Sequence, residues 1–242
     1  MSFLKNGQKR QGEDIRMESP RMAGSVWHRT SGFAKLTGVS SLTISTVANQ
    51  QGGGSSDKAE TCLYQIQSLH EVLYYVVAGT EKAGGRCCFG GNEALVSKIV
   101  TLDQQQTIVT LRVDIRCIGE NISIVEPPDK VLVTMEHIPK FDNKVFYVRT
   151  RDQAPLFALQ ELAPKGVHGL YRTFNVRTAT ELATETAKIV VLAEPIDPEA
   201  KSAIDVAKLA FYGYVDPVWK CCLLAATIYI LNYIQLNERR SP

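Results

Sequence analysis

One apolar run near the end of the chain constrains the fold more than any other feature. From Cys221 to Leu231 every residue except Thr227 is apolar, and polar side chains bound the run on both sides. A helix that is apolar all round must be buried on every side, in a protein core or in lipid. A bilayer span needs about 20 mostly apolar residues, so this run is short for a span. Residues 217–236 are therefore expected to form either the core helix of a barrel or a membrane-inserting helix.

Short β-rich segments precede this run at close spacing. Val, Ile, Thr, Tyr and Phe dominate them, and Gly, Pro, Asn or Asp separate them. The stretch 141–159 is typical of a hairpin whose turn lies at Arg151-Asp152-Gln153. About ten such strands in tandem, without helical segments between them, predict an antiparallel meander, sandwich or barrel. Strands are expected at 42–47, 62–67, 72–79, 95–102, 107–118, 121–127, 130–138, 144–150, 155–162, 171–178 and 187–196.

The remaining segments divide the chain. Residues 1–35 begin polar, charged and without periodicity, so they are expected to form a flexible N-terminal tail. Residues 36–240 are expected to form one barrel domain. Within it, residues 197–211 open with Asp-Pro and continue with good helix formers, which predicts a second helix before the C-terminal one.

Composition excludes several classes of function. The net charge of +2, without a basic cluster, argues against nucleic-acid binding. The six cysteines form two vicinal pairs and two single residues, which is neither a disulfide framework nor zinc-ligand spacing, so a reduced intracellular environment is favoured. Ser, Cys and His show no spacing typical of nucleophilic catalysis, so the chain is not expected to be an enzyme.

The order of the segments resembles the phospholipid scramblase family over Cys62 to Leu236. That family folds as a tubby-like closed antiparallel β-barrel of about 12 strands around a hydrophobic C-terminal helix, so this mainly β fold is expected here. The resemblance lies in four stretches taken together, namely CLYQIQSLHEVLYYVVAGTEKAGGRCCFGG (62–91), VSKIVTLDQQQTIVTLRVDIRC (96–117), ISIVEPPDKVLVTMEH (122–137) and VDPVWKCCLLAATIYILNYIQL (215–236).

The resemblance implies a membrane-associated protein whose partners are phospholipids. Its implied activity is bidirectional, non-selective phospholipid movement between leaflets, triggered by Ca²⁺, with the barrel on the cytoplasmic side of the plasma membrane. The alternative is a soluble tubby-like barrel that binds membranes, phosphoinositides or proteins without moving lipid. The helix sequence suits both interpretations.

The implied Ca²⁺ site is incomplete in this chain. The family carries Asp-x-Asp, a Phe-containing stretch and a second Asp-x-Asp before the terminal helix. Asp205, Phe211 and Asp216 match that pattern, but Ala203 and Tyr214 replace two of its carboxylates. Ca²⁺ takes about six to eight oxygens, so the loss of two carboxylates should weaken the site. Alternatively, both Asp residues are helix N-terminal residues that the helix dipole favours.

Lipidation is a second implied feature. The family carries a palmitoylated cysteine cluster in mid-chain, where this chain has Cys117 alone. Cys87 and Cys88 remain as lipidation candidates on a glycine-rich loop, or they are unmodified half-buried residues. A third feature is a possible headgroup patch on neighbouring strands, formed by Arg149, Arg151, Arg172 and Arg177. These arginines equally suit the solvated outer face of a barrel.

Overall fold

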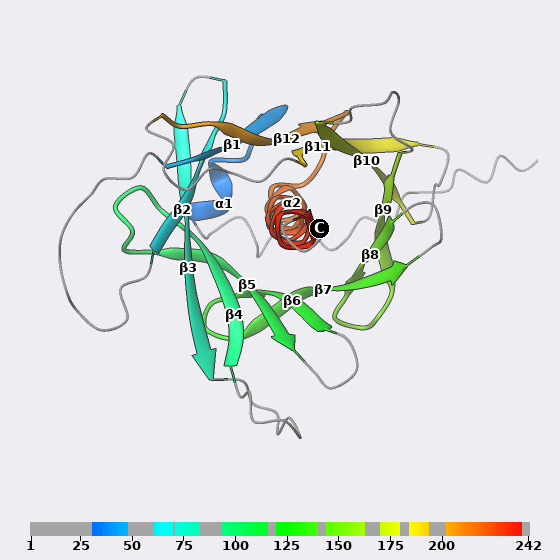
Figure 1. The fold of residues 1–242 in the computed structure, drawn as a ribbon, viewed down its shortest axis with the longest axis horizontal. Coiled ribbons are helices and arrows are strands. Elements are labelled where there is room, and N and C mark those ends of the chain that lie inside the picture. The colour runs from blue at the N-terminus through cyan, green and yellow to red at the C-terminus, as the bar shows by residue number, and fades with distance from the viewer. Residues whose placement is uncertain are drawn as a thin grey trace, which may run out of the picture.

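Twelve antiparallel strands pair in sequence order and close into a barrel, because β1 pairs with both β2 and β12 (Figure 1). This computed structural model describes residues 31–47, 61–69, 71–82, 93–115, 120–139, 144–162, 170–179, 184–193 and 202–238. The strands are β1 Ser41–Thr46, β2 Thr61–Gln67, β3 Val72–Lys82, β4 Glu93–Val100, β5 Thr107–Ile115, β6 Glu120–Glu126, β7 Lys130–Pro139, β8 Lys144–Thr150, β9 Pro155–Glu161, β10 Tyr171–Thr178, β11 Glu185–Leu192 and β12 Asp205–Phe211.

Alternation of side chains builds the wall of the barrel. In β11, Ala187, Ile189 and Val191 are buried and face inward, while the residues between them are less buried. The β8–β9 hairpin turns where the sequence predicts, since Thr150 N donates to Ala154 O at 2.9 Å and Gln153 has φ of 64°. The sequence-based prediction of a mainly β, closed antiparallel barrel is confirmed.

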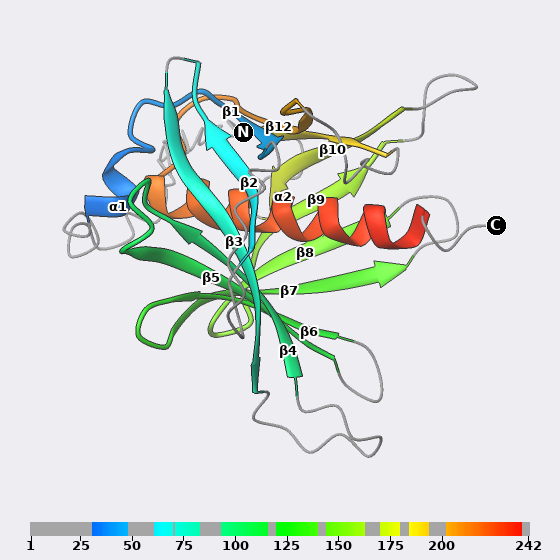
Figure 2. The same cartoon turned by 60° about the vertical axis from the view of Figure 1, so that its left-hand side comes forward.

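The C-terminal helix α2 (Pro217–Glu238) fills the barrel. Figure 1 shows it end-on at the centre of the strands, and Figure 2 shows it from the side. Every residue from Cys221 to Leu231 is at most 5% exposed, and the one polar member, Thr227, donates its hydroxyl to Leu223 O at 2.8 Å. About eight strands suffice to fill a barrel with its own side chains, so a larger barrel leaves room for a helix. Of the two arrangements expected for residues 217–236, the structure has the barrel core.

The beginning of α2 is fixed by a cap and by a buried lysine. Asp216 Oδ1 accepts a hydrogen bond from Val218 N at 2.9 Å, which makes Asp216 the N-cap, with proline at the first helical position. Lys220 is buried, and its Nζ donates to Leu36 O at 3.1 Å and Val39 O at 2.6 Å. Burial lowers the pKa of this ammonium group. These bonds attach the loop before β1 to α2.

A short helix, α1 (Ser31–Ala34), lies at the same end of the barrel (Figure 2). Phe33 is buried in the core, although residues 1–35 are expected as a tail. The part of that tail before Ser31 lies outside the described residues.

The helix predicted over residues 197–211 is wrong across its described C-terminal half. Asp205–Phe211 forms β12, which pairs with β1 and β11 and closes the barrel. Ala and Lys give this stretch a good helix propensity, but Ala207, Leu209 and Phe211 alternate inward as a strand requires. The free energy of closing the sheet outweighs the local preference.

Candidate functional site

The end of the barrel at which α2 finishes exposes a group of large apolar side chains. We call this end the mouth and define it by Leu162, Leu170, Tyr171 and Leu236, of which Tyr171 is 53% and Leu236 50% exposed. Adjoining strand ends hold these residues together, because β9 and β10 are paired and β10 is paired with β11. Large apolar side chains exposed at one end of a fold are typical of interaction surfaces.

Backbone and side-chain hydrogen bonds fix the geometry of the mouth. Leu162 N donates to Thr173 O at 2.8 Å, and the carbonyl of Leu170 accepts from Ala193 N at 2.7 Å. On α2, Gln235 Nε2 donates to Leu192 O at 3.0 Å, which attaches the last turn of the helix to β11. The next residue, Leu236, is half exposed in the same turn of the helix.

A buried carboxylate with two cations lies next to the apolar residues. Glu161 is only 6% exposed, and Arg172 Nη1 lies 3.5 Å from its Oε1. Lys144 donates its backbone N–H to Glu161 Oε2 at 3.4 Å and places its Nζ 5.2 Å from the centre of the Tyr233 ring. Two cations, Arg172 and Lys144, therefore stand beside this buried carboxylate.

Aromatic side chains line the barrel interior behind the mouth. His137 on β7 stacks on Phe146 with ring centroids 4.6 Å apart and meets Tyr233 edge-on at 5.1 Å. Burial, and secondarily the charge of Lys144, lower the pKa of His137, while Glu120 acts in the opposite direction. The imidazole is therefore neutral at neutral pH.

The two aspartates of the implied Ca²⁺ site lie toward opposite ends of β12. Asp205 opens that strand and accepts a hydrogen bond from Ser45 Oγ at 2.6 Å, whereas Asp216 follows the strand and caps α2. A seven-residue strand extends over about 20 Å, so one ion cannot contact both carboxylates in this arrangement. Among the described residues, no group of three or more His, Cys, Asp or Glu could hold a metal ion.

Of the four arginines of the expected headgroup patch, Arg172 lies apart from the other three, since the register places Arg177 toward the turn end of β8 and β9. Arg149 binds Glu136 on the outer wall at 3.1 Å, and Arg151 lies in the β8–β9 turn. Arg177 stands near the far end of β10 from Arg172, which instead forms part of the charged group at the mouth.

The expected lipidation sites, Cys87 and Cys88, lie outside the described residues. The second vicinal pair, Cys221 and Cys222, is fully buried in α2, and burial raises the pKa of both thiols. These two thiols are therefore structural parts of the core.

The α2 segment Pro217–Leu236 is the one helix of the described chain that has the length and hydropathy of a membrane span. Yet 83% of its most apolar window is buried inside the barrel, and the core helix of a soluble protein meets the same criteria. Length and composition alone therefore do not place it in a bilayer.

The fold and this site define a class of protein, namely a closed antiparallel barrel that encloses its C-terminal helix and exposes an apolar, basic mouth. No protein-family model, curated protein or solved structure matches the chain. The resemblance to scramblases therefore stays a prediction.

Proposed function

We propose that this chain is a non-enzymatic phospholipid-binding barrel that docks on the cytoplasmic face of a membrane through its mouth. The observation that supports this most directly is the exposed group Leu162, Leu170, Tyr171 and Leu236 beside the cations of Lys144 and Arg172. Apolar side chains of this kind enter the headgroup region, and nearby cations favour anionic lipids, which are enriched on the cytoplasmic leaflet.

Vesicle binding tests this proposal. The protein would be sedimented with vesicles of phosphatidylcholine alone and of phosphatidylcholine with phosphatidylserine. We expect binding that is stronger with phosphatidylserine, and the double variant Tyr171→Ser, Leu236→Ser should bind at least about tenfold more weakly. Leu102→Ser is the matched control, because Leu102 is 43% exposed in the turn after β4. Equal losses in the double variant and the control would refute docking through the mouth.

Ca²⁺-triggered lipid scrambling is the second candidate function, favoured by the length and apolar character of Pro217–Leu236. The protein would be reconstituted into vesicles with fluorescent lipid in both leaflets, followed by dithionite quenching with and without millimolar Ca²⁺. Quenching beyond the outer leaflet that depends on Ca²⁺ and is lost in Asp205→Ala, Asp216→Ala would support scrambling. Quenching of the outer leaflet alone leaves the docking barrel as the function.

A further inference from the structure

The wall of the barrel opens sideways where β6 and β7 separate. The described pairing between these strands ends at Ile122 and Met135, but β6 stays paired with β5 as far as Glu120, and β7 stays paired with β8 as far as Pro139. The resulting gap is a pocket of about 590 Å³. It reaches from the outer wall to α2, where Tyr229 and Tyr233 line it.

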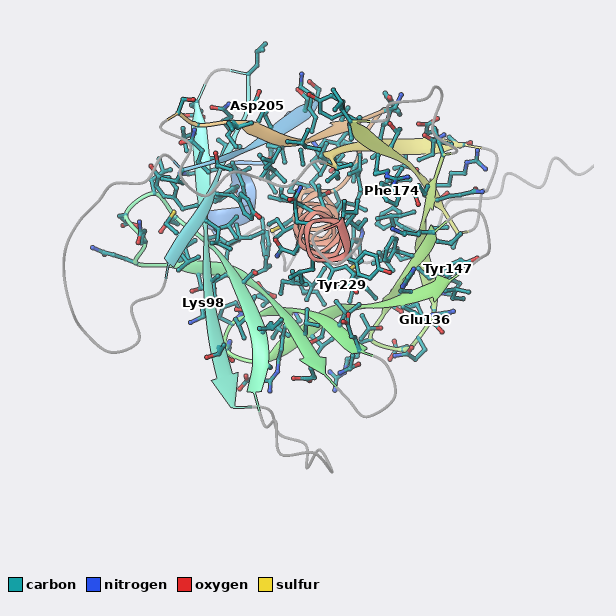
Figure 3. The ribbon with its side chains drawn as sticks, viewed as in Figure 1. Lys98, Glu136, Tyr147, Phe174, Asp205 and Tyr229 are labelled. Carbon is teal, nitrogen blue, oxygen red and sulfur yellow. The ribbon has the colours of Figure 1, made fainter. Side chains whose placement is uncertain are left out.

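Aromatic and apolar groups form the inner part of this pocket. The rings of Tyr229 and Tyr233 lie side by side, with centroids 6.1 Å apart and an interplanar angle of 33°. Figure 3 shows Tyr229 on the lower side of α2, inside the barrel, and Glu136 at the wall. Lys144 already lies over the Tyr233 ring at 5.2 Å, so the ring of Tyr229 is the one that remains for a ligand cation.

Charges of both signs surround the pocket. Glu120 and Glu136 stand at its rim, and the cations are Arg149 among the lining residues and Lys144 over the Tyr233 ring. Arg149 is already engaged, since its Nε and Nη2 both lie 3.1 Å from Glu136 Oε2 and its Nη1 donates to Gln153 O at 3.3 Å. Glu120 accepts a hydrogen bond from the Tyr229 hydroxyl at 2.7 Å, which places its carboxylate beside the ring.

His137 Nε2, beside the pocket, is buried and makes no hydrogen bond within the described part of the chain. A hydroxyl group in the pocket reaches it only if neighbouring side chains move.

We propose that this pocket binds a small organic cation with an alkylated ammonium group, such as choline or the choline headgroup of a phospholipid. Alkylated ammonium groups suit the combination of an aromatic face, a carboxylate and apolar neighbours. A metal ion suits it less, because metal ions such as Ca²⁺ require about six to eight oxygens and the described residues supply no such cluster. The proposal does not depend on membrane docking through the mouth.

Calorimetric titration in the absence of membranes tests the pocket alone. Tetramethylammonium chloride would be added to the full chain, with sodium chloride at equal ionic strength as the reference. We expect saturable binding with Kd of about 1 mM or tighter. No binding, or equal heat from sodium chloride, would refute the proposal whatever the result of vesicle sedimentation.

Two variants locate the binding. Glu120→Gln should weaken binding about tenfold, because it removes the charge and keeps the shape of the side chain. Tyr229→Leu should weaken it through loss of the ring that remains for the cation. Glu81→Gln is the matched control, because Glu81 is an exposed carboxylate on β3 that lies 3.8 Å from Lys98. Figure 3 shows Lys98 on the opposite side of the barrel from Glu136. Wild-type affinity in Glu120→Gln would refute the site.

The source of the ammonium group is separated by two further probes, choline and glycerophosphocholine. Binding of both indicates a phospholipid headgroup, and binding of choline alone indicates a free metabolite. Both results support a site for an alkylated ammonium group. If ammonium chloride binds as tightly as tetramethylammonium chloride, the proposal is refuted.

Discussion

The replacement Leu224→Ala tests whether α2 is the core of this domain. Leu224 is fully buried inside the barrel, and the replacement removes three carbon atoms from its side chain. Each buried methylene is worth about 0.8 kcal/mol, and the cavity that is left adds to this loss. We therefore expect the free energy of unfolding to fall by about 3 to 5 kcal/mol. That loss is a large part of the stability of an ordinary domain, about 5 to 15 kcal/mol.

The measurement is urea unfolding, followed by circular dichroism of the strands and by the fluorescence of Trp219, which packs against the core from α2. Leu236→Ala is the control on the same helix, because Leu236 is half exposed and its loss should cost less than about 0.5 kcal/mol. If α2 instead lay in lipid, Leu224 would gain little over lipid tails, which are equally apolar. Losses below about 1 kcal/mol in both variants would refute a core role for the helix.

Three further predictions concern ionisable groups. Burial and the Lys144 charge lower the pKa of His137. Below about pH 6.5 the unfolded chain therefore binds a proton at this residue more readily than the folded chain does. The free energy of unfolding should fall on acidification to about pH 5.5. Glu161→Gln removes the buried charge beside Arg172 and should lower the free energy of unfolding in urea by about 2 kcal/mol. This is less than for a fully buried pair, because Arg172 is partly exposed. Asp216→Ala removes the cap of α2 and should cost about 1 kcal/mol, equally with and without Ca²⁺.

Each of these predictions has a result that contradicts it. The same decrease on acidification in His137→Phe would assign the pH dependence to other groups. Unchanged stability in Glu161→Gln would mean that the ion pair with Arg172 contributes nothing to the free energy of unfolding. A loss in Asp216→Ala that grows when Ca²⁺ is present would identify Asp216 as an ion ligand as well as a cap.

Most of the fold could be predicted because its signals are local. Alternation, turn residues and the all-round apolar run each lie within a few consecutive residues, and each strand expected from Cys62 onward has its counterpart in the barrel. The helix prediction is wrong for Asp205–Phe211 because the residues of this stretch favour a helix by themselves. Its partners, β1 and β11, decide its conformation, and β1 is more than 150 positions away in the chain.

The mouth and the side pocket could not be predicted, because both depend on register. Glu161 meets Arg172 only through the pairing of β9 with β10, and Glu120 meets Tyr229 across a sequence separation of 109 residues. The position of Arg172 shows the opposite error, because residues on strands that are neighbours in the sequence do not necessarily point to the same face. Arg172 shares the inward parity of the buried Phe174, whereas Arg149 binds Glu136 on the outer wall.

The enclosed helix and the docking function are compatible because the barrel and α2 each bury the other. Moving α2 into a bilayer would gain its apolar side chains little, since lipid tails and a protein core are similarly apolar. The same movement would expose the inward faces of the strands to water and break the bonds of Tyr229 to Glu120 and of Lys220 to Val39 O. The docking that we propose therefore needs no movement of α2, because Tyr171 and Leu236 at the mouth are already exposed and nothing in the core has to open.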